Sequence, residues 1–242
     1  MPLRPPRSLL RRVADAAIDT AWPRLCEACG APLTDAEDVI CLHCELTMPL
    51  VRHSGPDITE LERRLLSTWR MERVCSMFWY YRGDPYARLI HHTKYDRRPR
   101  IGRILARACA AGLRVEGFFD GVDLLVPVPL HPLKLWQRGY NQSVHIALGI
   151  SEATGIPVAE LLRATRLNSS QTRYNAAERW TNVKGTFALR PGAAARIGGS
   201  HVLLVDDVIT TGATLLDCIR AIHDESPQTR ISAFTLAATH LS

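Results

Sequence analysis

Long apolar runs, internal repeats and low-complexity tracts are all absent from this chain of 242 residues. A bilayer-spanning helix needs roughly 18 to 20 consecutive apolar residues, so the sequence predicts neither an integral membrane protein nor an exported one. Hydrophobic residues make up 46% and charged residues 22% of the chain, close to the globular average, which excludes a largely disordered protein. The length fits one large domain, or one domain with a small extra module.

An even set of cysteines, typical of a disulfide scaffold, is also missing. Seven cysteines occur, and four of them form two Cys-x-x-Cys pairs, Cys26 with Cys29 and Cys41 with Cys44. This spacing suits tetrahedral zinc held by four thiolates. Four protein ligands leave no open position, so we expect the zinc to be structural. Reduced thiols and a metal site indicate a cytoplasmic protein rather than a secreted one.

Acidic residues are outnumbered by basic ones, and the net formal charge is +6. Most of the excess lies in residues 163–190, where six basic residues against one acidic residue give +5. An excess of positive charge favours anionic partners such as phosphates or nucleic acid. A polar segment of this length inside a compact domain is usually functional or mobile.

Strand-forming and helical segments alternate from residue 73 onward. We expect strands over 73–81, 122–128, 201–205 and 230–237, and helices that begin at Asp84 and Pro99 and that span 140–153 and 213–223. This alternation predicts a mostly parallel sheet with helices on both faces. The expected organisation is an N-terminal amphipathic helix over 1–25, a cysteine module with a helical linker over 26–70, and the main domain over 71–242.

The strongest local signal is the segment 202–214, VLLVDDVITTGAT. A buried strand leads into two adjacent carboxylates, Asp206 and Asp207, which a turn and a helix follow. Ligands of open parallel sheets bind beyond the carboxyl ends of strands, and the N–H groups at a helix N-terminus favour a phosphate. A phosphate would repel the carboxylates, so we expect them to face sugar hydroxyls or hydrated magnesium. The candidate phosphate-binding residues are Thr210, Thr211, Gly212, Ala213 and Thr214.

This motif resembles the fingerprint of type I phosphoribosyltransferases, which bind phosphoribosyl pyrophosphate. The segments 80–95, 126–142 and 171–187, together with the paired cysteines, resemble the ComF family of competence proteins in the same order along the chain. The resemblance implies an α/β fold of the type I phosphoribosyltransferase kind, with a small N-terminal module similar to a zinc ribbon. It also implies a link to DNA uptake in natural transformation, with single-stranded DNA and competence proteins, such as a helicase of the same operon, as partners.

The same resemblance assigns roles to the site residues. Asp206 and Asp207 would be the catalytic pair that fixes the ribose, with Mg²⁺ on the pyrophosphate and the ribose hydroxyls. The proline-rich segment 126–134 would be the pyrophosphate loop, in which Lys134 and Arg138 neutralise the leaving group; a solvated turn is the alternative.

The basic stretch 163–190 would be a lid that excludes water, or else a solvated surface loop. The candidate lid residues are Arg173, Arg179 and Lys184.

Three functions fit these features: a phosphoribosyltransferase with an unknown acceptor, a binding protein for phosphoribosyl pyrophosphate or a nucleotide without turnover, and a competence factor that binds single-stranded DNA. The sequence shows no general base. Thr210 stands where purine-salvage relatives carry an aspartate that contacts the purine, which argues against a 6-oxopurine acceptor. Interleaved aromatic and basic residues between 69 and 88 fit stacking on single-stranded nucleic acid or a strand with buried aromatics.

Overall fold

The computed structural model describes residues 23–51, 63, 66, 71–81, 83–166 and 185–239. The chain divides into two compact units, with the boundary between Thr47 and Met48. The predicted N-terminal helix and most of the predicted helical linker lie outside the described residues. Residues 48–51 at the start of that linker are extended rather than helical, because Leu50 forms an antiparallel bridge with Phe78.

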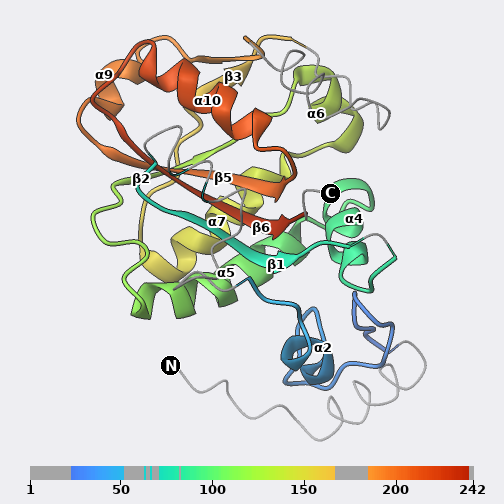
Figure 1. Ribbon diagram of the computed structural model, residues 1–242. Helices are drawn as coiled ribbons and strands as arrows, with labels where there is room; N and C mark the ends of the chain where they lie inside the picture. The colour runs from blue at the N-terminus through green and yellow to red at the C-terminus, as the bar shows by residue number, and fades with distance from the viewer. Residues whose placement is uncertain are drawn as a thin grey trace, which may run out of the picture. The chain divides into compact units, whose positions relative to one another are not determined.

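A four-stranded parallel sheet forms the centre of the second unit (Figure 1). The strand order is β1-β6-β5-β2, and every neighbouring pair in it is parallel. The predicted parallel sheet is therefore confirmed. The strands are β1 (Val74–Trp79), β2 (Leu124–Pro127), β5 (His201–Ile209) and β6 (Arg230–Ala238).

Helices cover both faces of this sheet, as the alternating pattern predicts. Figure 1 shows α5 (Pro99–Val115) and α7 (Gln142–Thr154) on one face, and α10 (Ala213–His223) with α9 (Ala193–Ile197) on the other. Both faces of the central strands must therefore be apolar, and every residue of β6 after Arg230 is buried. None of the helices in the described ranges is long and apolar enough to cross a membrane.

A glycine allows the close packing of α5 on α7. A Cβ atom built at Gly149 of α7 would lie 2.1 Å from the carbonyl oxygen of Arg103 on α5. No larger residue fits at that position without a shift of one helix, because interiors are close-packed. Gly149 thus sets how near the two helices approach each other beneath the sheet.

A side-chain hydrogen bond lies in the turn before one helix and at the N-cap of another. The Asp84 carboxylate accepts a hydrogen bond from the Tyr86 N–H at 2.9 Å before α4 (Ala87–Tyr95). The Asn141 side chain likewise accepts from the Ser143 N–H at 3.0 Å at the start of α7. Polar side chains in this place satisfy N–H groups that have no partner inside the helix.

The proline-rich segment predicted as a loop over 126–134 leads directly into a helix, and residues 128–131 between β2 and that helix are irregular. Residues Pro132–Arg138 form a helix, α6. Pro132 occupies the first turn, where its missing N–H costs no hydrogen bond, and His131 Nδ1 accepts from the Leu133 N–H at 3.2 Å. Gly139, with φ of 82°, ends the helix. Proline here begins a helix instead of preventing one.

Candidate functional site

Two of the predicted site segments meet at one edge of the sheet. Pro127, the last residue of β2, lies beside Val205 of β5 in the parallel register. The Val128 N–H donates to the Val205 carbonyl at 2.9 Å. The carboxyl end of β2 thus lies beside β5 just before Asp206 and Asp207, which belong to the C-terminal half of β5 (His201–Ile209). This is the edge at which parallel sheets bind ligands.

The turn after β5 has the geometry expected of an anion-binding loop. Gly212 precedes α10 with φ of 78°, a left-handed conformation that glycine adopts at little cost. The Thr211 hydroxyl accepts from the Ala213 N–H at 3.4 Å. Thr210 is exposed and Thr214 is half-buried, whereas Thr211 is buried.

Three side chains that the sequence analysis did not identify surround the carboxylates. Lys94 of α4 places its Nζ 3.2 Å from Asp207 Oδ1. Two residues of the first turn of α7 donate as well: the Gln142 amide to Asp207 Oδ2 at 2.8 Å, and the Ser143 hydroxyl to Asp206 Oδ1 at 3.1 Å. The pair is therefore held by α4 and α7, which lie far from β5 in the sequence.

The electrostatics of these groups are coupled. Burial and the neighbouring charge of Asp207 raise the pKa of Asp206 to about 7. Burial lowers the pKa of Lys94, but the charges of Asp207 and Asp206 more than offset this, so its pKa is raised and the amine stays protonated. Adjacent carboxylates repel each other, and the Lys94 ammonium reduces that repulsion.

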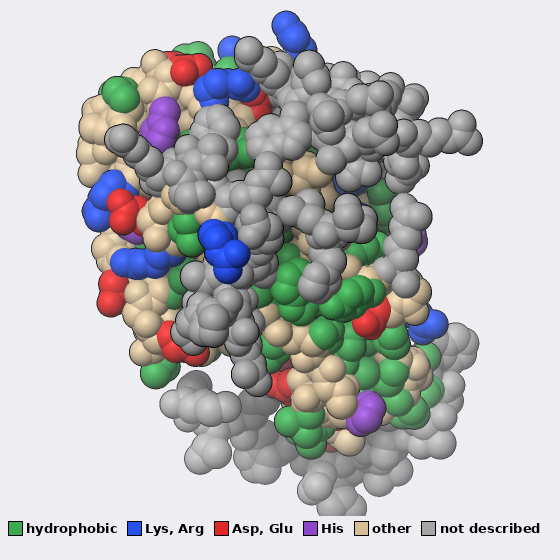
Figure 2. Space-filling model, viewed as in Figure 1, with side chains coloured by type: hydrophobic (Ala, Val, Ile, Leu, Met, Phe, Trp, Pro, Cys, Tyr) green, Lys and Arg blue, Asp and Glu red, His purple; other side chains and the backbone are tan. Residues whose placement is uncertain are grey.

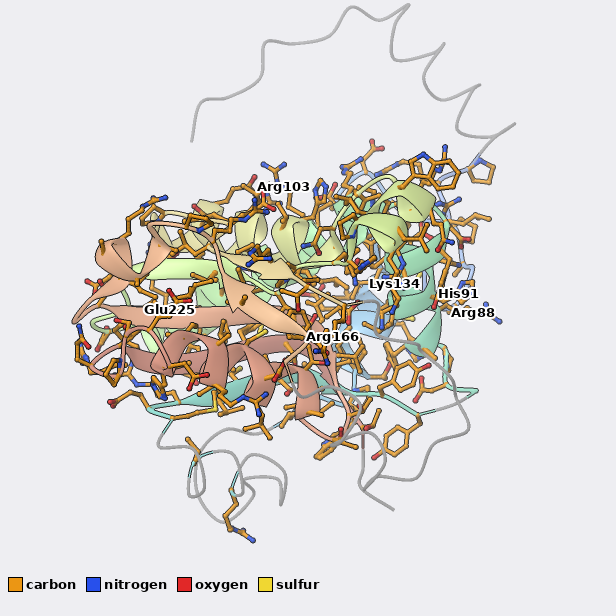
Figure 3. The ribbon with its side chains drawn as sticks, turned by 90° about the horizontal axis from the view of Figure 1, so that it is seen from above. Arg88, His91, Arg103, Lys134, Arg166 and Glu225 are labelled. Carbon is orange, nitrogen blue, oxygen red and sulfur yellow. The ribbon has the colours of Figure 1, made fainter. Side chains whose placement is uncertain are left out.

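The predicted pyrophosphate-binding cations lie on the inner side of α6. No residue of α6 is buried, and Lys134 and Arg138 are its only half-buried residues. Arg138 stacks its guanidinium 5.1 Å from the centroid of the Tyr95 ring of α4. Burial, and then the charges of Arg138 and Lys94, lower the pKa of Lys134. Figure 3 shows Lys134 beside the helix that carries the labelled Arg88 and His91.

The basic stretch is framed by a hairpin that the sequence analysis missed. Strands β3 (Leu162–Ala164) and β4 (Phe187–Leu189) pair antiparallel. The buried Asp217 carboxylate of α10 accepts from the N–H groups of three consecutive residues at 2.7 to 3.0 Å. The helix α10 thus anchors the start of β4. The three donors are Gly185, Thr186 and Phe187.

Most of that basic stretch lies outside the described residues, among them Arg173, Arg179 and Lys184. Arg163, Arg166 and Arg190 are described, and all three are exposed.

The four paired cysteines come together in the first unit. Their Sγ atoms all lie within 4.8 Å of one another, and those of Cys29 and Cys41 are 3.7 Å apart. Four sulfurs about 2.3 Å from a tetrahedral zinc are separated by about 3.8 Å, so the cluster fits this metal. Gly30 makes the tight turn after the first pair with φ of 79°.

Backbone donors prepare the cluster for a cation. The Cys41 N–H donates to Cys26 Sγ at 3.3 Å. Burial raises the pKa of Cys26, but hydrogen bonds from the backbone of Cys29, Cys41 and Ala28 offset this and lower its pKa to about 7. A cysteine binds a metal as its thiolate. The surroundings of Cys26 favour that form, whereas burial and the neighbouring thiols raise the pKa of Cys44 when no metal is bound.

The interleaved aromatic segment is mostly structural where it is described. Phe78 of β1 is fully buried and Trp79 packs against the core, which favours the buried-strand reading over nucleic-acid stacking. Tyr81 is exposed. Of the three cysteines outside the two Cys-x-x-Cys motifs, Cys75 and Cys218 are buried and Cys109 is half-buried.

Comparison with known proteins identifies the domain. The phosphoribosyl transferase domain family matches residues 158–240, which contain the carboxylate pair, the loop and α10. The chain is 28% identical over 211 residues to the DNA utilization protein YhgH of Salmonella typhimurium, covering 81% of this chain and 88% of the relative.

Two competence proteins match at similar levels. Competence protein F of Haemophilus influenzae is 27% identical over 201 residues, 78% of this chain and 86% of the relative. Competence protein ComFC of Bacillus subtilis is 26% identical over 214 residues, 88% of this chain and 77% of the relative. The matches extend over most of the chain and bear out the resemblance seen in its motifs. Over most of its length the chain is thus similar to DNA utilization and competence proteins, and its residues 158–240 match the phosphoribosyl transferase domain family.

Proposed function

We propose that the domain binds phosphoribosyl pyrophosphate at the carboxyl edge of β5. One observation carries this proposal: the carboxylate pair lies in the C-terminal half of a central strand and is followed within a few residues by the Gly212 loop at the start of α10. The loop takes the 5′-phosphate through N–H groups and hydroxyls of residues 210–214. The carboxylates then lie one sugar-length away, where they accept hydrogen bonds from ribose hydroxyls.

The remaining residues fit the other end of this ligand. Lys134 and Arg138 supply positive charge to the pyrophosphate. Lys94 is a third cation nearby, and its charge contributes to the lowered pKa of Lys134. In a transfer reaction an acceptor attacks C1 of the ribose as pyrophosphate leaves, and cations on the leaving group lower the barrier. The lid role of Arg173, Arg179 and Lys184 belongs to the same proposal.

The carboxylates fit a magnesium ion that arrives with the ligand better than one resident in the protein. Both oxygens of Asp207 are already engaged, by Lys94 and by Gln142, so the pair offers no free chelating site. When bound to the pyrophosphate and ribose oxygens, Mg²⁺ would neutralise charge on the leaving group. We further propose that zinc occupies the four-cysteine cluster and has a structural role.

The biological role that we propose is DNA handling in natural transformation. The names of the relatives point to DNA utilization and competence. Figure 2 shows Lys and Arg side chains spread over this face among acidic ones, and no continuous basic stripe among its coloured atoms. We propose that contact with single-stranded DNA depends on residues 163–190, because these carry +5 of the net charge.

Calorimetric titration tests the ligand. We expect one molecule of phosphoribosyl pyrophosphate to bind per chain when Mg²⁺ is present, and much weaker binding in EDTA with zinc retained. A pyrophosphate-release assay over candidate acceptors then separates a transferase from a binding protein without turnover. The proposal is wrong if zinc-loaded, folded protein binds no phosphoribosyl pyrophosphate at millimolar concentration.

A salt titration tests the DNA role. Replacing Arg166, Arg173 and Lys184 by Ala should weaken binding of single-stranded DNA with little dependence on its sequence. Each phosphate contact contributes about 0.7 to the slope of log affinity against log salt, so three lost contacts should reduce the slope by about 2. Unchanged affinity in the triple variant, and no competition from phosphoribosyl pyrophosphate, would move DNA binding to another surface.

A further inference from the structure

The β3–β4 hairpin is too short to be stable alone and depends on α10. Its strands have three residues each, and an isolated two-stranded hairpin is marginally stable in water. Leu162 and Leu189 pair across the strands and are buried, as is Phe187 of β4. These side chains belong to the hydrophobic core cluster to which α10 contributes Leu215 and Ile219. One face of the hairpin therefore packs into the core beside α10.

A buried carboxylate of α10 fixes the hairpin in place. Asp217 is 4% exposed, and its two oxygens accept from the N–H groups of Gly185, Thr186 and Phe187. Gly185 has φ of 76°, and a left-handed residue of this kind lets successive N–H groups converge on one anion. The Arg220 guanidinium forms an ion pair with the same carboxylate. An amide cannot replace this carboxylate fully, because its NH₂ group would face N–H donors.

The carbonyl groups of the same turn are held from the other strand. The Thr165 N–H donates to the Thr186 carbonyl at 2.7 Å. The Thr165 hydroxyl lies 2.9 Å from the carbonyl oxygens of Gly185 and Thr186. Residues 185 and 186 are thus bound through their N–H groups by Asp217 and through their carbonyls by Thr165. The described ends of the basic stretch 163–190 are therefore joined at one point on α10.

The opposite, outer face of the hairpin is positively charged. Arg163 and Arg190 each directly follow a buried leucine, so strand alternation places both side chains away from the core. Arg166 lies two residues beyond β3, and all three arginines are exposed. The described parts of the basic stretch, residues 163–166 and 185–190, contain no acidic residue. No ion pair between described residues reaches these arginines, so their charges face solvent.

We propose that this outer face binds the phosphate backbone of single-stranded DNA through Arg163, Arg166 and Arg190, and that Asp217 is the positioning residue that holds the hairpin on α10. Guanidinium groups match the geometry of phosphate oxygens, and all three cations are arginines. Contacts to the backbone carry no sequence information, so binding should depend little on the bases. The inference rests on the proposed DNA role and gives it a surface of described residues.

Four variants of the full chain test the surface and its support: Arg163→Gln with Arg166→Gln, Arg114→Gln with Arg230→Gln, Asp217→Asn, and Thr165→Val. The second is the matched control, because Arg114 and Arg230 are also exposed arginines and lie at the end of α5 and the start of β6. The measurements are the Kd for oligothymidylate as a function of salt, hydrogen exchange, and the Tm.

The Arg163→Gln, Arg166→Gln protein should bind oligothymidylate severalfold more weakly. Its slope of log affinity against log salt should fall by about 1.4, because each lost phosphate contact contributes about 0.7. The control should keep the wild-type slope, although it has lost the same charge.

Asp217→Asn should speed hydrogen exchange over residues 185–189, leave the exchange of β5 and β6 unchanged, and lower the salt slope. A residue with a merely structural role would lower the Tm and leave the slope of the folded protein unchanged. Thr165→Val should give the same pattern to a smaller extent, and it supplies the test if Asp217→Asn does not fold.

A wild-type slope in the Arg163→Gln, Arg166→Gln protein would overturn the surface, and the wider DNA role would stand if wild-type protein binds oligothymidylate. A wild-type slope in every folded variant of Asp217 and Thr165 would overturn the positioning role. Poly-glutamate that competes as strongly as oligothymidylate at equal charge would assign the surface to an acidic protein instead. If wild-type protein binds no single-stranded DNA, the DNA role and this surface fail together.

Discussion

Removal of one cysteine from the cluster should separate the behaviour of the two units. Cys41 lies at the centre of the cluster: its Sγ is 3.7 Å from that of Cys29, and its N–H donates to Cys26 Sγ. Cys41→Ser replaces a thiolate by a hydroxyl, a poor zinc ligand. It leaves the backbone donor in place, so the change tests the metal rather than the fold of the turn.

The expected loss is large relative to the size of the module. A structural zinc contributes on the order of 10 kcal/mol to folding, which is as much as a whole domain usually has. Apart from the cysteines, the buried apolar residues described within 26–44 are Ala28 and Val39, and these cannot replace the metal. Residues 26–44 should therefore lose their order, while the second compact unit, from Met48 onward, keeps its own.

Elemental analysis and hydrogen exchange measure both effects. Wild-type protein should hold one zinc per chain and Cys41→Ser close to none, with fast exchange over 26–44 and unchanged protection in β5 and β6. The matched control is Cys109→Ser, because Cys109 is a half-buried cysteine outside the cluster. The Cys109→Ser protein should keep its zinc. Reduced, zinc-free wild-type protein with a protected 26–44 segment would refute the reasoning.

Three further variants test the packing and the titration of the second unit. Gly212→Ala should cost about 1–2 kcal/mol through its left-handed backbone, lower the Tm by roughly 2–8 °C and weaken ligand binding; an unchanged Kd would argue against the loop as the phosphate site. Gly149→Ala should cost about 1–3 kcal/mol by overpacking against Arg103, measured by urea unfolding, with the Kd little changed. Burial and nearby arginine charges lower the pKa of His201, whose Nδ1 is buried without a hydrogen-bond partner among the described residues. The folded protein thus binds fewer protons there than the unfolded chain, so stability should be lost as the pH falls below about 6.5; His201→Gln should show a shallower loss, and an equal slope would contradict this.

The segments with a strong local pattern could be predicted from the sequence. The continuous apolar run at 201–205 is the start of β5, and the helix predicted over 213–223 has those bounds in the structure. The turn between them, with threonine and glycine after two carboxylates, predicts a phosphate loop. This prediction is possible because the conformation of a turn depends on residues that are neighbours in the chain. The cysteine cluster was predictable for the same reason: the spacing alone brings the ligands of each pair together.

What the sequence did not reveal depends on packing between distant segments. Lys94 reads as an ordinary cation in the last turn of an amphipathic helix, and only the packing of α4 places it on Asp207. The strands of the β3–β4 hairpin have three residues each, too few to show a period. Of the side chains around the carboxylates, only Gln142 had a signal in the sequence: it is a polar residue that directly follows the N-cap residue Asn141.

The most direct test of the account is a crystal structure of the protein with Mg²⁺ and phosphoribosyl pyrophosphate. The account predicts the 5′-phosphate on the loop of residues 210–214 and the ribose hydroxyls within hydrogen-bond distance of the carboxylate pair, Asp206 and Asp207. Density for the ligand away from the C-terminal half of β5 and the loop that follows it would contradict the account.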